Sequence, residues 1–109
     1  MELIDTREVP FDRTRAVVWP LASGEHGCVR LIKLAPGQVL PAHTHDSSDV
    51  FLFVAEGAGM LRVDDRDVAF PTGTLARYQG DEELAVRNPT GQPLTVVVFF
   101  SPAFPPRQS

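Results

Sequence analysis

Short apolar runs alternate with turn-forming residues along most of the chain, and this alternation restricts the fold more than any other feature. The ten prolines and eight glycines are dispersed between the runs. Short runs bounded by such residues are typical of strands, whereas a helix needs a longer stretch with a period of about 3.6 residues. The pattern therefore predicts an all-β sandwich or barrel.

We expect about eight strands, which is the usual number for a small closed barrel of two sheets. Gly57 and Gly59 permit positive φ at a first hairpin turn, and two further turns fall at residues 64–67 and 71–73. The apolar runs that we assign as strands between the other turns are residues 17–19, 29–34, 50–55, 75–78, 84–87 and 94–100.

Composition limits the classes of function. A chain of 109 residues, 43% of them hydrophobic, is long enough for one domain with a modest core. The net charge is -4 and no basic block is present, so we expect no nucleic-acid partner. The single cysteine, Cys28, leaves no internal disulfide. The sequence shows neither a signal peptide nor a membrane span, and we expect a cytoplasmic protein.

The last predicted strand, residues 94–100, is apolar at almost every position. A strand with one face in the core and the other in water alternates apolar and polar residues, and this one does not. Its outer face should therefore meet a helix, an arm or a second subunit, and we favour a homodimer.

Two histidines one residue apart, His43 and His45, are the most plausible metal ligands in the sequence. On an extended segment, side chains two residues apart project to the same side, roughly 7 Å apart along the backbone, so that two imidazoles can converge on one ion. The alternative is a pair of surface histidines on a loop between Pro41 and Asp46. The spacing leaves both interpretations open.

The residues around this pair resemble the first sequence motif of the cupin superfamily, and a second partial match follows downstream. The resemblance covers about residues 29–102. The positions that carry it are Pro36-Gly37, His43-x-His45, residues 46–49, Glu56-Gly57-x-Gly59, Pro71-x-Gly73 and Asn88-Pro89.

The resemblance implies an all-β fold of the cupin type, a double-stranded β-helix or jelly-roll barrel. We expect a single cupin domain over residues 1–109. Its barrel core should cover about 17–102, after an N-terminal arm at 1–16. The tail at 103–109 is expected to lie on the surface or fray.

Cupin metal sites commonly use two histidines and a glutamate from the first motif and one histidine from the second. By this resemblance His43 and His45 are in place, whereas Val50 stands at the glutamate position and Ala76 at that of the second-motif histidine. Asp49 is the candidate third metal ligand if a bulge turns it inward. Otherwise it stays in the loop and accepts hydrogen bonds from backbone N–H groups.

Three other side chains are candidates for the cavity around the site. Tyr78 lies two residues after Ala76 and should share its face, either offering its hydroxyl to the site or sitting half-buried in the barrel. Arg30 would bind a carboxylate ligand if it faced inward, and otherwise lies on the outer face. His26 would approach the histidine pair only if the segments flanking the Pro36-Gly37 turn paired, and is otherwise a solvated loop residue.

The resemblance implies metal-dependent chemistry on a small organic molecule, either as an oxygenase or as an isomerase. A divalent transition metal (Fe, Mn, Zn, Ni or Co) would serve as Lewis acid or oxygen-binding centre. The alternative is a non-enzymatic module, a small-ligand-binding or sensor cupin whose incomplete site holds no metal. In both cases the expected partner is a small-molecule ligand or substrate.

Overall fold

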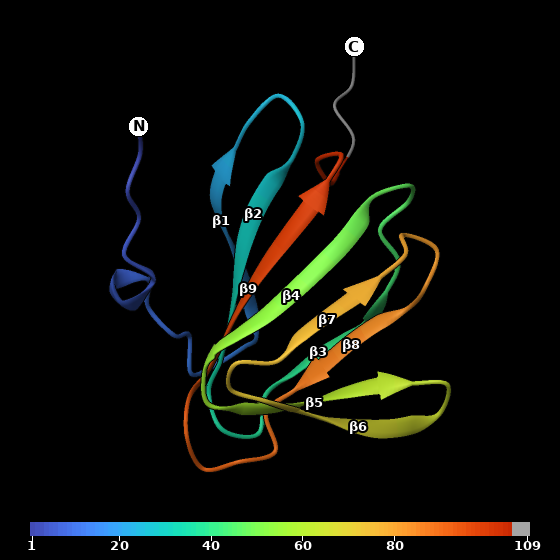
Figure 1. The fold of residues 1–109 in the computed structure, drawn as a ribbon. Helices are drawn as coiled ribbons and strands as arrows, with labels where there is room; N and C mark the ends of the chain where they lie inside the picture. The colour runs from blue at the N-terminus through green and yellow to red at the C-terminus, as the bar shows by residue number, and fades with distance from the viewer. Residues whose placement is uncertain (106–109) are drawn as a thin grey trace.

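The computed structural model describes residues 1–105, which form nine β-strands and one short 3-10 helix, η1 (Thr6–Glu8) (Figure 1). This part of the chain has no helix long and apolar enough to cross a membrane. The strands are β1 (Val17–Ser23), β2 (Cys28–Leu34), β3 (Val39–His43), β4 (Asp49–Glu56), β5 (Ala58–Val63), β6 (Arg66–Pro71), β7 (Leu75–Tyr78), β8 (Leu84–Arg87) and β9 (Leu94–Ser101).

From β2 onward the chain changes sheet after nearly every strand. One sheet has five strands in the order β1-β2-β9-β4-β7, and the other has four in the order β3-β8-β5-β6. Neighbouring strands run antiparallel, and the chain winds around a common interior (Figure 1). This arrangement confirms the predicted all-β jelly-roll barrel.

Side chains of the five-stranded sheet alternate between the barrel interior and the outside. In β4, Val50, Leu52 and Val54 are fully buried, whereas the residues between them are half-buried or exposed. In β9, Val96 and Val98 are inside in the same way. Burying an aliphatic side chain of this size contributes about 1.5–3 kcal/mol. The core is therefore supplied by alternate positions of strands whose sequence is apolar at nearly every position.

The segments on either side of the Pro36-Gly37 turn do not pair with each other. Strand β2 pairs with β9, from Cys28↔Phe100 to Leu34↔Leu94, and β3 pairs with β8 in the other sheet. Gly37 has a φ of 82° and helps the chain to cross between the sheets. The pairing on which a role for His26 depended is therefore absent.

Gly59 was expected in a hairpin turn with Gly57, and this is wrong. Only Gly57 has positive φ, 84°, and Gly59 lies within β5. A Cβ atom at position 59 would lie 2.9 Å from a Leu94 methyl group. The absence of a side chain at Gly59 thus allows close packing in the core rather than a turn.

The end of the N-terminal arm packs on the barrel of its own chain. The Lys33 ammonium lies 4.7 Å from the centre of the Phe11 ring, and the Gln38 side-chain amide donates to the Asp12 carbonyl over 2.6 Å. Burial lowers the pKa of Lys33, and the ring face offers this cation partial compensation.

The described part of the tail lies on the surface of the barrel, with Pro102 and Pro105 exposed, but it is held there by specific contacts. Residues 102–105 fold back over one end of the barrel, where the Ser48 hydroxyl donates to the Pro102 carbonyl over 2.7 Å. Phe104 is half-buried there and packs against the core. Residues 106–109 of the predicted tail lie outside the described residues.

The substitution Gly57→Ala should lower the free energy of unfolding by at least about 1 kcal/mol. The backbone at this position has a φ of 84°, and an added methyl group would overlap the carbonyl oxygen of Pro93. Gly24→Ala is the matched control, because nothing lies within 4 Å of a Cβ at that position. Urea denaturation of both variants measures the difference, and equal effects would contradict the assigned turn.

Candidate functional site

The two histidines meet at the end of the barrel that the tail covers. His43 is the last residue of β3, and His45 follows in a turn in which Asp46 has a φ of 53°. Their Nε2 atoms are 2.9 Å apart. The His45 side chain is only 2% exposed, whereas His43 is exposed. The imidazoles therefore converge, which is one of the two interpretations that the spacing left open, although only His43 belongs to the strand.

Hydrogen bonds fix the tautomers of the pair when no ion is bound. His43 Nδ1 lies 2.9 Å from the Pro41 carbonyl, which can only accept, so Nδ1 carries the hydrogen. The Nε2 atom of neutral His43 is then an acceptor and receives the Nε2 hydrogen of His45. The remaining ring nitrogen of His45, Nδ1, is buried without a hydrogen-bond partner in the structure.

Burial lowers the pKa of His45 from its usual 6.5 to about 4. The neighbouring His43 and Arg30 lower it further, and Asp46 opposes them. The imidazole is consequently neutral at pH 7, as a metal ligand must be. Binding an ion through Nε2 would require the Nε2 hydrogen of His45 to move to Nδ1.

The geometry of the pair fits two positions of a metal centre. Nitrogen ligands bind first-row ions at about 2.0–2.1 Å, so two of them at a right angle are separated by about 3.0 Å. The measured Nε2–Nε2 distance is 2.9 Å. The bond from His43 Nδ1 to the Pro41 carbonyl is the kind of outer contact that orients a metal-binding imidazole. Within residues 1–105, however, no third His, Cys, Asp or Glu completes a cluster.

Asp49, the candidate third ligand, is not brought to the pair. It begins β4 opposite Ser101 and is exposed, whereas Val50 beside it is fully buried. Successive side chains of a strand point to opposite faces, and the strand begins without the bulge that would turn Asp49 inward. The inward position thus carries the apolar Val50.

Tyr78 and His26 also lie away from the histidine pair. Tyr78 is buried in the core, where its hydroxyl has no partner and burial raises its pKa. It borders a separate hollow of about 440 Å³ beside Glu82. The His26 side chain is 91% exposed in the loop before β2, with Glu25 3.9 Å away.

Arg30, in contrast, faces inward and borders the small cavity at the histidines. This cavity has a volume of about 40 Å³, enough for an ion or a few waters but too small for an organic substrate. Its polar lining among the described residues comes from His43, His45 and Arg30. The rest of the wall is aliphatic and aromatic.

Two features of the site were missed by the sequence analysis. The Phe104 ring meets His45 edge-on at 4.9 Å between centroids and stacks with Phe100 at 5.7 Å. Gly80 accepts the His45 backbone N–H over 2.7 Å, and a methyl group there would overlap the Asp46 carbonyl. A lone phenylalanine between prolines and a glycine in a polar loop carry no local signal for either role.

Stability in the absence of metal should depend on pH through His45. Its folded-state pKa of about 4 lies below the usual value of 6.5, so the unfolded chain takes up the proton first. The contribution of the neutral His45 imidazole to the free energy of unfolding is therefore fully present above pH 6.5. It is lost as the pH falls toward 4, at up to about 1.4 kcal/mol per pH unit.

Urea unfolding in EDTA at several pH values, compared with the variant His45→Gln, isolates the contribution. The variant should show a shallower decline below pH 6.5, whereas the exposed control His26→Gln should follow the parent protein. Parallel curves for His45→Gln and the parent would show that the imidazole is not buried in the neutral form.

Known proteins support the same fold. A family model described as Cupin domain matches residues 30–100. The tetracenomycin polyketide synthase protein TcmJ of Streptomyces glaucescens is 30% identical over 93 residues, which are 84% of this chain and 62% of that protein. The chain thus spans less than two thirds of this relative.

Two solved structures are similar to this chain, one over nearly all of its own length and the other over about half of it. An RmlC-like cupin protein of Desulfovibrio desulfuricans has a TM-score of 0.86 at 26% identity, over 95% of this chain and 99% of that one. A sugar phosphate isomerase from a cupin superfamily, from Silicibacter pomeroyi, has a TM-score of 0.64 at 30% identity, over 71% of this chain and 51% of that one. With the family match spanning most of the barrel, the chain belongs to the cupin family.

Proposed function

We propose that this cupin binds a divalent transition metal ion (Fe, Mn, Zn, Ni or Co) through the Nε2 atoms of His43 and His45 and acts on a small organic molecule. The observation that carries the proposal is the 2.9 Å separation of the two imidazole Nε2 atoms at the barrel mouth. Metal-dependent oxygenase or isomerase chemistry is the reaction class that we assign to the site.

The residues of the chain have separate roles in this proposal. His43 and His45 hold the ion, and the Pro41 carbonyl keeps the His43 ring in its binding orientation. Phe100 and Phe104 shield His45 from water, because their rings pack beside it. When bound, the ion supplies a Lewis acid with coordination positions that the protein leaves open.

The relatives support a small, oxygen-containing substrate. One is named as a polyketide synthase protein and another as a sugar phosphate isomerase, and molecules of both classes carry carbonyl or hydroxyl oxygens. Because this chain covers only 62% and 51% of those two proteins, the proposal extends to the substrate class and not to their reactions.

Protein purified without a histidine tag should contain close to one equivalent of transition metal, measured by plasma mass spectrometry after dialysis. The double variant His43→Ala/His45→Ala should lose at least about nine tenths of it, because no nitrogen ligand remains at the mouth. His26→Ala is the matched control and should retain the metal. Equal metal in the parent and the double variant, or none in either, would contradict the proposal.

A second candidate function is binding without metal or catalysis, as a small-ligand or sensor module. The observation in its favour is that, within the described residues, no third His, Cys, Asp or Glu joins the two imidazoles in a metal-binding cluster. Metal-free parent protein that still binds a small ligand would select this function. Oxygen uptake or isomerised product with candidate substrates would select the enzyme.

We also propose that the chain forms a homodimer through the outer face of the five-stranded sheet. Phe53 is 40% exposed, Leu75 63% and Phe99 43%, although all three are large and apolar. Phe53 pairs with Leu75 across the sheet, and Phe99 pairs with half-buried Phe51. These four residues form one apolar outer-face patch, and a second copy of the same patch would cover it.

Light scattering after size exclusion should give about twice the chain mass of 12.0 kDa for the parent. The variant Phe53→Glu/Phe99→Glu should elute as a monomer, because burying carboxylates at the patch is unfavourable. Val68→Glu, at an exposed position of the other sheet, should remain dimeric. A monomeric parent, or a dimeric double variant, would refute the interface.

A further inference from the structure

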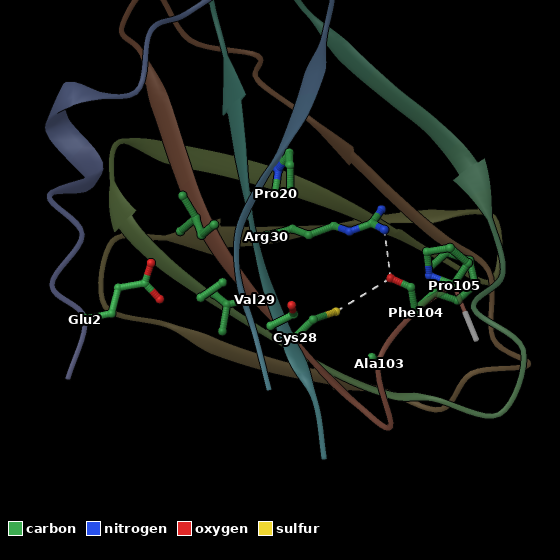
Figure 2. A pocket seen from close by; sticks show the side chains of 11 residues that line it. Glu2, Pro20, Cys28, Val29, Arg30, Ala103, Phe104 and Pro105 are labelled. Atoms are coloured by element: carbon green, nitrogen blue, oxygen red, sulfur yellow. Dashed lines mark hydrogen bonds between the residues drawn. The ribbon is translucent and has the colours of Figure 1, made fainter. Parts of the chain in front are cut away.

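Phe104 is bound at the barrel mouth much as a ligand would be. Its carbonyl oxygen accepts a hydrogen bond from Arg30 Nη2 over 2.7 Å and one from Cys28 Sγ over 3.6 Å. Figure 2 shows both bonds, with Phe104 and Pro105 facing Arg30 and Cys28. The ring of the same residue lies against His45 and Phe100. The chain thus presents a phenyl ring and a carbonyl group to the site from its own tail.

Among the described residues, Arg30 is a half-buried cation without a carboxylate partner. None of the ion pairs formed within residues 1–105 includes it. Its guanidinium lies 5.7 Å from the centre of the Phe100 ring and 5.8 Å from that of Phe104. A neutral carbonyl satisfies one of its donors, whereas a carboxylate would form two charge-assisted hydrogen bonds. A carboxylate would therefore bind Arg30 more strongly than the Phe104 carbonyl does.

Phe104 and Arg30 stand between two hollows. They line both the cavity of about 40 Å³ at the histidines and an outer hollow of about 550 Å³ between β1, β2 and the tail (Figure 2). Ligand pockets commonly have volumes of about 300–1,000 Å³. Displacement of Phe104 would join the outer hollow to the histidine pair. The exposed carboxylate of Glu2 also borders the outer hollow and would face solvent beside an entering ligand.

We propose that the ligand of this site is a small aryl carboxylate that binds by displacing Phe104. Its carboxylate pairs with Arg30 in place of the Phe104 carbonyl, and its ring takes the place of the phenyl group beside Phe100 and His45. The carbon skeleton from the Phe104 ring to its carbonyl is that of 3-phenylpropanoate, which is therefore the probe of choice. The inference deepens the proposed function by naming a ligand class for the same site.

Competition by the tail has a measurable consequence. A ligand that binds only when Phe104 is displaced has an apparent affinity reduced by the fraction of molecules in that open state. Removing the Phe104 side chain should remove the competition from its ring for the position beside His45 and Phe100, while the backbone carbonyl at position 104 still competes for Arg30. Removing the Arg30 charge should weaken binding in either background, since a hydrogen-bonded ion pair is lost.

The test is calorimetric titration of 3-phenylpropanoate into the full chain, as purified and again in EDTA. Phe104→Ala should bind at least about tenfold more tightly than the parent. Adding Arg30→Gln to Phe104→Ala should weaken binding at least about tenfold. 3-Phenylpropan-1-ol, which has the ring without the charge, should bind weakly to both. Val68→Ala, at an exposed position of the four-stranded sheet, is the control and should match the parent.

Three results would overturn the inference: equal affinity in the parent and Phe104→Ala, undiminished binding in the Arg30→Gln variant, or no binding to any folded variant. Circular dichroism and a thermal melt establish that each variant is folded, and Phe104→Leu, which keeps apolar bulk, replaces Phe104→Ala if the latter unfolds.

Metal content is measured on the same samples. Metal retained without ligand binding refutes this inference alone, and ligand binding without metal refutes the metal proposal alone.

Discussion

The contact between the two imidazole Nε2 atoms is the interaction on which the site depends. His45 is 2% exposed, so its ring has exchanged water for His43 and a wall of aromatic side chains. Leaving a buried polar group unpaired costs about 1–3 kcal/mol, and this cost already applies to its Nδ1 atom. The Nε2 atom of His45 must therefore have a partner. This partner is either His43, through a hydrogen bond, or an ion that both rings bind.

The rest of the fold holds this contact in place from three distant parts of the sequence. Strand β3 delivers His43, the Gly80 carbonyl anchors the His45 backbone, and the tail supplies Phe104. Ser48 and Arg30 bind the tail through backbone carbonyls, so the closure depends on two specific hydrogen bonds as well as on apolar contact. The tail thus shields His45 from water, which strengthens electrostatic interactions at that ring, whereas His43 stays exposed. Access from the outer hollow then requires movement of the tail.

The barrel itself could be predicted from the sequence because its signals are local. The apolar runs 50–55 and 94–100, bounded by turn residues, predicted strands close to those observed. Because neighbouring side chains of a regular strand point to opposite faces, Val50 lies inward and Asp49 outward. The convergence of His43 and His45 was one of two interpretations that their spacing left open, and it depends on the turn at Asp46.

The closure of the site could not be predicted because it depends on contacts between distant residues. Whether Arg30 faces inward depends on the register of β2 against β9, which no local pattern fixes. The role of Phe104 follows from its contacts with Arg30 and His45, far earlier in the chain. Gly80 resembles any loop glycine until Asp46 is placed against it. Pairing across the Pro36-Gly37 turn was a reasonable expectation that the change of sheet removed.

Anomalous diffraction from crystals grown with Zn²⁺ or Ni²⁺ tests the central claim most directly, because it locates the ion relative to both rings. The account predicts a single peak inside the barrel mouth at about 2.0–2.1 Å from the Nε2 atoms of both His43 and His45. A mouth without a peak, with the two nitrogens still in direct contact and metal only on the outer surface, would contradict it.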